Sequence, residues 1–177
     1  FKIEKKSFES ISKNAKRLSI ISQERITDEL NKIILSETPS LGFKMLLTTK
    51  LLHQFFPQMV KLQGIEFVGN HGHKDNFFHT TEVLDNISKK TNNLWLRWAA
   101  ILHDIAKPNT KKYEEGHGWT FHAHEFIGAK MVPKIFRTLK LPLNEKMKYV
   151  KKLVLLHLRP IVLAQEIVTD SAIRRLL

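Results

Sequence analysis

The sequence contains no cysteine among its 177 residues. Disulfide bonds and thiolate metal sites are therefore excluded, so any metal ion would have to be bound by His, Asp or Glu. The absence of disulfides is typical of a reducing compartment, and no basic-then-apolar leader opens the chain, so we predict a cytoplasmic protein. The chain begins with Phe1, not Met, which we interpret either as a piece of a longer polypeptide or as a start whose first residues are missing.

Glycine and proline are also scarce, with 7 and 6 residues, while hydrophobic residues make up 42% of the chain and charged residues 26%. This composition is typical of a folded globular protein and excludes collagen-like and low-complexity chains. No run approaches the roughly 18 consecutive apolar residues that a membrane-spanning helix needs. We therefore expect no membrane partner, and one domain or two small helical ones.

Acidic residues are in the minority, because 29 Lys and Arg stand against 17 Asp and Glu and give a formal net charge of +12. A surface of this charge attracts polyanions through long-range electrostatics and counterion release. RNA is the natural candidate for the polyanion. A solvated basic face without a partner is the alternative.

Apolar residues recur at helical spacing over most of the chain, and no run of four or more residues alternates cleanly as a strand would. The fold class is therefore predicted to be all-α. We expect helices at about residues 7–18, 22–34, 79–89, 94–106, 122–139 and 144–158, one or two short helices within 41–56 that end at Pro57, and a last helix that begins near Asp170. Residues 64–76 are rich in Gly and Asn, which breaks the helical pattern. We place a domain boundary there, between residues 1–63 and 64–177.

The residues that carry chemistry stand at the end of an apolar helix, where His103 and Asp104 are adjacent. Neighbouring residues of a helix diverge by about 100°, so both can reach one ion only near the helix end, with further ligands from other helices. His79 is the obvious third ligand, because it would point the same way as the buried face of its own helix. An Asp after an unbroken apolar helix would also be costly to bury without a partner.

Further candidate ligands lie downstream, namely His157, Asp170 and either His122 or His124, which stand near the start of one helix. A His and Asp set without thiolates suits one or two divalent ions such as Mn, Ni, Co, Fe, Mg or Zn. Such an ion polarises a phosphoryl oxygen and lowers the pKa of a bound water. Asp104 would bridge the ion and that water.

Two smaller sets of residues complete the expectations for the site and the core. Lys107, about one helical turn beyond His103, would neutralise charge on a phosphate. We expect Trp95 and Trp98 to pack in the core. The histidines of the Gly-rich loops are expected to be solvated; these are His71, His73 and His117.

These residues resemble two known families. Those that resemble the HD superfamily of metal-dependent phosphohydrolases are His79, the stretch Leu-His-Asp-Ile-Ala-Lys at 102–107, the stretch His-Glu-Phe-Ile-Gly-Ala at 124–129, and His157. Residues 14–18, 22–26, 39–43 and 51–57 resemble the RNA-binding segment of bacterial class II CCA-adding tRNA nucleotidyltransferases and poly(A) polymerases. Together the two matches cover nearly the whole chain, in the order that such enzymes use.

The resemblance implies that residues 1–63 form a helical neck and body that hold tRNA, and that 64–177 form an HD-type helical bundle. In several family members this domain hydrolyses 2′,3′-cyclic phosphates, 2′-nucleotides or simple phosphate esters. The predicted metal ligands are His79, His103, Asp104, His124, His157 and Asp170, although the last motif Asp could instead lie beyond Leu177. The predicted catalytic residues are Asp104 and Lys107, and the predicted RNA contacts are Lys13, Lys16, Arg17 and Arg25.

The nucleotidyltransferase head of these families has no counterpart before Phe8, so we expect nucleotide addition only of a full-length protein. For the chain itself, we favour a tRNA-processing family protein with a hydrolytic HD site, acting on nucleotides or RNA ends. The alternative is a non-catalytic tRNA-binding body with a structural or vestigial HD site. A regulatory nucleotide sensor is a weaker third hypothesis, since no segment is suited to relaying a signal.

Overall fold

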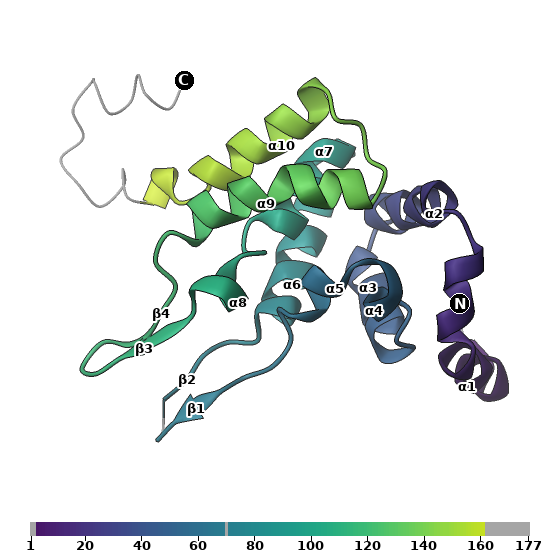
Figure 1. The fold of residues 1–177 in the computed structure, drawn as a ribbon, viewed down its shortest axis with the longest axis horizontal. Helices are drawn as coiled ribbons and strands as arrows, with labels where there is room; N and C mark the ends of the chain where they lie inside the picture. Colours follow the sequence, from purple (N-terminus) through teal and green to yellow (C-terminus); the bar gives the residue numbers. More distant parts are fainter. Residues whose placement is uncertain (1–2, 70, 162–177) are drawn as a thin grey trace.

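The computed structural model describes residues 3–69 and 71–161, and helices dominate it (Figure 1). The helices are α1 (Lys5–Lys13), the 3-10 helix η1 (Ala15–Ile20), α2 (Gln23–Leu35), α3 (Pro39–Thr48), α4 (Leu52–Phe55), α5 (Pro57–Val60), α6 (Asn76–Ser88), α7 (Leu94–Leu102), α8 (Lys107–Thr110), α9 (His124–Thr138) and α10 (Glu145–Leu156). The all-α prediction is confirmed. Within the described ranges, no helix is long and apolar enough to cross a membrane.

Two short antiparallel hairpins are the only strands of the described residues, and the helical pattern did not predict them. One joins β1 (Phe67–Val68) to β2 (His71–Gly72), and the other joins β3 (Lys112–Glu114) to β4 (Gly118–Thr120). Figure 1 shows both hairpins on the same side of the helical body, below α8 and α6. They form in the Gly-rich loops, where the turn residues allow the chain to reverse.

Several predicted helix boundaries were wrong at prolines. The helix expected from residue 41 begins earlier, at Pro39; the predicted helical stretch 41–56 does end before Pro57, but Pro57 and Pro108 each stand in the first turn of a further helix. The fixed φ of proline and its missing N–H suit that position, where the N–H has no helical partner. The helix before Pro108, α7, ends at Leu102, earlier than the predicted end near residue 106.

Side-chain caps set the start of three of the four helices that carry the candidate site. The Asp75 carboxylate accepts from the N–H groups of Phe77 and Phe78, and so starts α6 at Asn76, three residues before the predicted start. Asn93 and Asn144 cap α7 and α10 in the same way. An N-cap acceptor of this kind typically stabilises a helix by about 1 kcal/mol. His79, which was predicted to begin this helix, is thus its fourth residue and lies at the end of its first turn.

The core forms where α7 packs against α2, α6 and α10, with α9 beside α10 (Figure 1). Trp98 is fully buried there, and its ring contacts Phe56 and Phe136. The prediction that Trp98 packs in the core is confirmed, and Trp95 lies half-buried against the same cluster. The core is continuous from Leu30 of α2 to the helices that follow residue 64.

A buried arginine fastens the start of α7. Arg97 is 1% exposed and donates five hydrogen bonds of 2.7–3.0 Å. Its acceptors are four backbone carbonyls and one side-chain amide, those of Ile34, Ser36, Ser88, Thr91 and Asn92. The guanidinium therefore joins the end of α2 to the loop between α6 and α7.

Candidate metal centre

The ends of four helices meet at one place and bring together five of the six predicted ligands. His79 lies in the first turn of α6, and His103 and Asp104 follow the last residue of α7. His124 is the first residue of α9, and His157 follows the last residue of α10. Because each residue stands at a helix end, the five side chains can face one point without a backbone passing between them.

The carboxylate of Asp104 is the centre of this cluster. Its Oδ2 atom lies 3.1 Å from His103 Nε2 and 3.7 Å from His79 Nε2. Its Oδ1 atom lies 3.2 Å from His124 Nε2 and 3.9 Å from His157 Nε2. All four imidazoles thus present the same nitrogen to one carboxylate. Asp104 belongs to two possible ligand groups, one with His79 and His103 and one with His124 and His157. Within each group the ligand atoms lie within 4.8 Å of one another.

Backbone carbonyls hold three of the rings in place. The Nδ1 atoms of His103, His124 and His157 lie 2.7, 2.8 and 2.7 Å from the carbonyl oxygen of the residue three positions earlier. A neutral ring in this position donates its Nδ1–H to the carbonyl, which leaves the lone pair on Nε2. Metal-binding histidines are commonly oriented in this way by a hydrogen bond at the other nitrogen.

The local charges keep Asp104 ionised. Burial alone raises the pKa of this carboxyl, but the close contacts with His103 and His124 and the charge of Lys107 outweigh it, so the pKa of Asp104 lies far below its usual range. The pKa of His124 is raised, since its contact with Asp104 outweighs the effect of burial. Removal of Asp104 would therefore leave buried donors without their acceptor.

The pKa values of His79 and His157 shift in the opposite direction, downward. Burial lowers the pKa of His79, and the charge of Asp104 only partly opposes it. Burial also lowers the pKa of His157, and there the hydrogen bond with the Val154 carbonyl and the charge of Asp104 only partly oppose it. A lowered pKa favours the neutral imidazole, which is the form that binds a metal ion.

These residues fit a divalent cation. Asp104 Oδ2 is buried and accepts no well-aligned hydrogen bond, although Lys107 Nζ lies 2.7 Å and His103 Nε2 3.1 Å away. Buried carboxylate oxygens without such a bond are rare in folded proteins, and a bound cation can satisfy them. Imidazole and carboxylate together suit Mn, Fe, Co, Ni and Zn.

The remaining predicted site residues fall in different places. The side chain of His122 is 79% exposed and lies 3.9 Å from Glu114, so the structure brings His124, and not His122, to the cluster. Lys107, in the first turn of α8, reaches Asp104 as an ion pair. Asp170 lies outside the described residues.

His73 is not the solvated loop residue that we expected. Its ring is half-buried and meets Trp119 and Phe121 edge-on, at centroid distances of 5.3 and 6.0 Å, and so joins the two hairpins. The ring of Phe121 in turn lies 5.4 Å from Lys107 Nζ, and its carbonyl accepts from His124. Phe121 was not predicted as a site residue, because its signal in the sequence is weak: aromatic residues spaced around Gly116 and Gly118.

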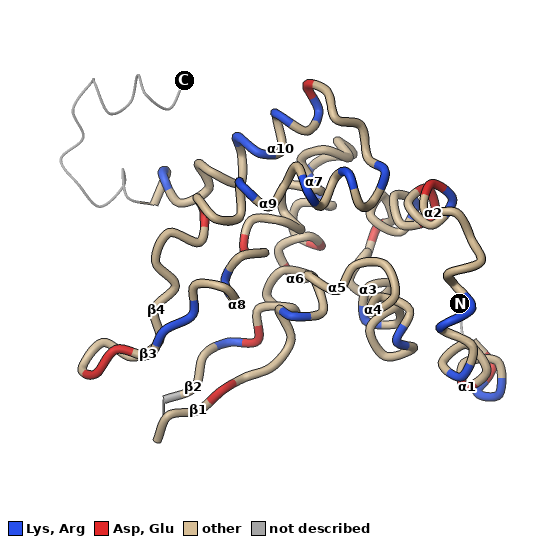
Figure 2. Tube along the Cα trace, viewed as in Figure 1, with Lys and Arg blue, Asp and Glu red and all other residues tan. Residues whose placement is uncertain are grey.

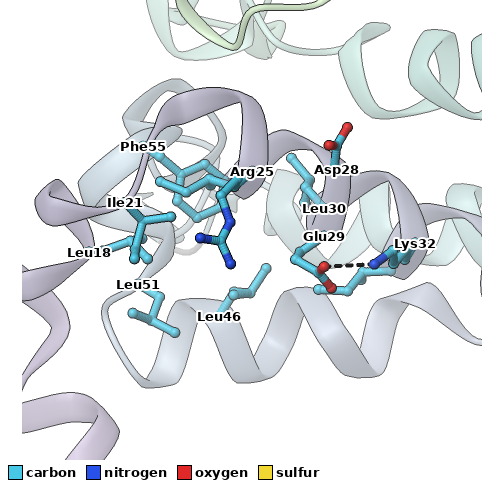
Figure 3. Close-up of a pocket in the computed structure, with 12 residues that line it drawn as sticks. Leu18, Ile21, Arg25, Asp28, Glu29, Leu30, Lys32, Leu46, Leu51 and Phe55 are labelled. Carbon is cyan, nitrogen blue, oxygen red and sulfur yellow. Dashed lines mark hydrogen bonds and ion pairs between the residues drawn. The ribbon is translucent and has the colours of Figure 1, made fainter.

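The predicted RNA contacts are exposed and lie apart from this cluster. Lys13, Lys16 and Arg17 are on α1 and η1, and Arg25 is on α2. Figure 3 shows the Arg25 guanidinium over a hollow lined by apolar side chains of η1, α2, α3 and α4. The hollow has a volume of about 600 Å³ and shares no lining residue with the metal centre.

Comparison with known proteins agrees with the geometry. The family described as "Probable RNA and SrmB- binding site of polymerase A" matches residues 1–62, and the family described as "HD domain" matches residues 76–175. The chain belongs to the HD-domain family. The resemblance that the motifs carry is thereby confirmed, with an RNA-binding segment ahead of the HD domain.

The similar curated proteins are tRNA nucleotidyltransferases. An A-adding tRNA nucleotidyltransferase of Deinococcus radiodurans is 35% identical over 131 residues, which cover 72% of this chain and 30% of the relative. A multifunctional CCA protein of Alkalilimnicola ehrlichii is 31% identical over 121 residues, which cover 67% of this chain and 28% of the relative. A CC-adding tRNA nucleotidyltransferase of Thermus thermophilus is 26% identical over 172 residues, which cover 89% of this chain and 38% of the relative. The HD-domain chain thus spans about a third of the length of these relatives.

Proposed function

We propose that the HD-domain centre is a divalent-metal phosphohydrolase acting on phosphate esters of nucleotides or of RNA ends. The observation that carries this proposal is the convergence of four imidazole Nε2 atoms on the Asp104 carboxylate, each within 3.9 Å. Four imidazole nitrogens around one buried carboxylate form a donor set that suits a divalent metal ion.

His79, His103, Asp104, His124 and His157 would hold the ion. A bound divalent ion supplies Lewis acidity toward a phosphoryl oxygen and makes a water molecule more acidic. The Asp104 carboxylate offers Oδ1 or Oδ2 as an acceptor, and its low pKa keeps it ionised. The side chain of His79 is 40% exposed, while that of Asp104 is 2% exposed. The ester would therefore enter from the His79 side.

Lys107 would contact the phosphate and not the ion. Its Nζ lies 2.7 Å from Asp104 Oδ2, and its side chain is 20% exposed, so it borders the centre on the side of Phe121. A cation held at that place neutralises charge that develops on the phosphate oxygens during hydrolysis.

The partner and setting follow from the relatives. We propose that tRNA is the RNA bound by residues 1–63, since the family match there is to an RNA-binding site and the relatives are named for tRNA. A cytoplasmic location is proposed on the same ground. Nucleotide addition is proposed only for a longer protein that contains a head domain.

The test is hydrolysis of 2′,3′-cyclic AMP with Mn, Ni, Co, Fe, Mg or Zn added in turn. We expect a metal-dependent rate that EDTA abolishes and that falls by at least about 100-fold in Asp104→Ala, because the shared ligand is lost. His122→Ala is the matched control, since this exposed histidine lies two residues from His124 and outside the cluster. Circular dichroism would confirm that both variants fold.

Two results would contradict the proposal. One is a native chain that turns over no cyclic or linear phosphate ester with any of these metals. The other is an Asp104→Ala variant that keeps the native rate. In the first case, the chain would instead be a non-catalytic tRNA-binding body, with RNA affinity that falls steeply with salt and no hydrolysis.

A further inference from the structure

The positive charge of the chain is concentrated in one segment. Residues 124–161 contain nine Lys or Arg and two Asp or Glu, whereas residues 63–123 contain seven of each. Residues 1–62, the segment that matches the RNA-binding family, contain eleven Lys or Arg and six Asp or Glu. The excess of positive charge is therefore densest on α9 and α10, which lie outside that segment.

These nine cations face solvent, and most have no acidic partner. They are all exposed, and within the described part of the chain only Lys148 forms an ion pair, with Glu145 at 2.7 Å. The nine are Lys130, Lys134, Arg137, Lys140, Lys146, Lys148, Lys151, Lys152 and Arg159. Cations that the fold leaves unpaired remain available to an external polyanion.

The cations form rows on two neighbouring helices. Lys130, Lys134 and Arg137 are four and three residues apart, a spacing that places them on one side of α9. Lys148 and Lys152 repeat the spacing of four on α10, with Lys151 beside them. The two helices pack against each other, and Figure 2 shows basic segments along both. We call the six residues the α9–α10 basic face.

Both rows lead away from the metal centre. His124 begins α9 and His157 follows α10, and their Nε2 atoms are 3.3 Å apart, so these two helix ends meet at the centre. Lys130 is six residues from His124 and Lys152 is five from His157. At a rise of about 1.5 Å per residue, the rows begin about 8–9 Å along the helices from the ligands.

We propose that the α9–α10 basic face binds the phosphate backbone of an RNA strand whose end reaches the metal centre. This inference rests on the proposed function and narrows its substrate to a phosphate ester at the end of an RNA strand. Rows of exposed Lys and Arg gain affinity by releasing counterions from successive phosphates, without base recognition. A free mononucleotide would reach the centre without touching either row.

The first experiment measures binding of a labelled tRNA transcript from about 50 to about 200 mM KCl. The test variant is Lys151→Gln/Lys152→Gln, and the matched control is Lys89→Gln/Lys90→Gln, which removes the same charge from another exposed pair of adjacent lysines. We expect the test variant to bind roughly tenfold more weakly, with a salt slope smaller by about 2. The control should bind as the native chain does.

Three binding results would overturn the inference. The first is equal weakening in both lysine variants, which would mean that total charge alone attracts RNA. The second is native affinity in Lys151→Gln/Lys152→Gln. The third is binding to phosphatidylserine vesicles that depends on Lys151 and Lys152, together with tRNA binding that does not depend on them. The face would then bind membranes and not RNA.

The second experiment separates this inference from the proposed function. It compares kcat/KM for 2′,3′-cyclic AMP with kcat/KM for an oligonucleotide that ends in a 2′,3′-cyclic phosphate. We expect the oligonucleotide-to-mononucleotide ratio to fall about tenfold in Lys151→Gln/Lys152→Gln, through KM, and to stay native in the control. An unchanged ratio overturns the inference alone. If the native chain hydrolyses neither substrate, the proposed function fails, and the tRNA titration still decides whether the face binds RNA.

Discussion

Asp104 shows how one buried acid can organise a site. Its side chain is 2% exposed, yet its pKa is held far below the usual range, because imidazoles and a lysine surround it.

One backbone angle decides which of His122 and His124 joins the cluster. Between them, Ala123 has a φ of 59°, in the left-handed region. The chain turns there, so His124 starts α9 inside the cluster and His122 remains in solvent.

Lys107 gives a prediction at the scale of one residue. We expect Lys107→Ala to lower kcat/KM for 2′,3′-cyclic AMP by about 10–100-fold, because the phosphate loses a neutralising cation. The affinity for Mn, measured by calorimetry, should not weaken, since Lys107 is not a proposed ligand. Lys112→Ala is the control, because the side chain of Lys112 is 74% exposed. Weaker Mn binding in Lys107→Ala would show instead that the lysine only supports the ligands.

At the scale of elements, helix ends and close helix packing build the site. α9 approaches α10 at Gly128, where an added Cβ would lie 3.2 Å from Val154 Cγ1. This close approach helps to place His124 beside His157. In the amino-terminal part, α3 approaches α2 in a similar way, because Gly42 faces the side chain of Ile33.

Gly42 gives the prediction for this scale. A Cβ at position 42 would overlap Ile33 Cγ2, which cannot move freely because it is on a β-branched side chain. We expect Gly42→Ala to lower the free energy of unfolding by about 1–3 kcal/mol, although alanine favours a helix by about 1 kcal/mol. Urea unfolding followed by circular dichroism would measure the change.

The matched background for this test is Ile33→Leu, which removes the overlapping methyl group. Gly42→Ala should cost much less stability there than in the native chain. If Gly42→Ala stabilises the native chain, the contact between α2 and α3 is looser than the structure indicates.

At the scale of the whole molecule, the two predicted domains share one core. Arg97 of α7 donates to carbonyls at the end of α2 and at the end of α6, so it spans the predicted boundary at residue 64. We expect Arg97→Leu to lower the stability of the whole chain by about 3–5 kcal/mol, because several buried carbonyls lose their donor. Thermal unfolding should remain a single transition in the native chain.

Arg159→Leu is the control for this prediction, since Arg159 is exposed. It should leave the midpoint of unfolding unchanged. Two separate transitions in the native chain would contradict the expectation of one cooperative unit and would favour independent domains at the predicted boundary.

The sequence by itself determined the all-α class, the family and the types of residue at the centre. Helical periodicity reports which face of a helix is apolar, and His103 next to Asp104 after an apolar helix is a local signal. Only the tertiary structure decided which of His122 and His124 joins Asp104, that Phe121 and His73 connect the hairpins near Lys107, and where the unpaired cations gather. The physical reason is that these outcomes depend on how helix ends and loops that are distant in the sequence meet in space, which periodicity within a helix does not encode.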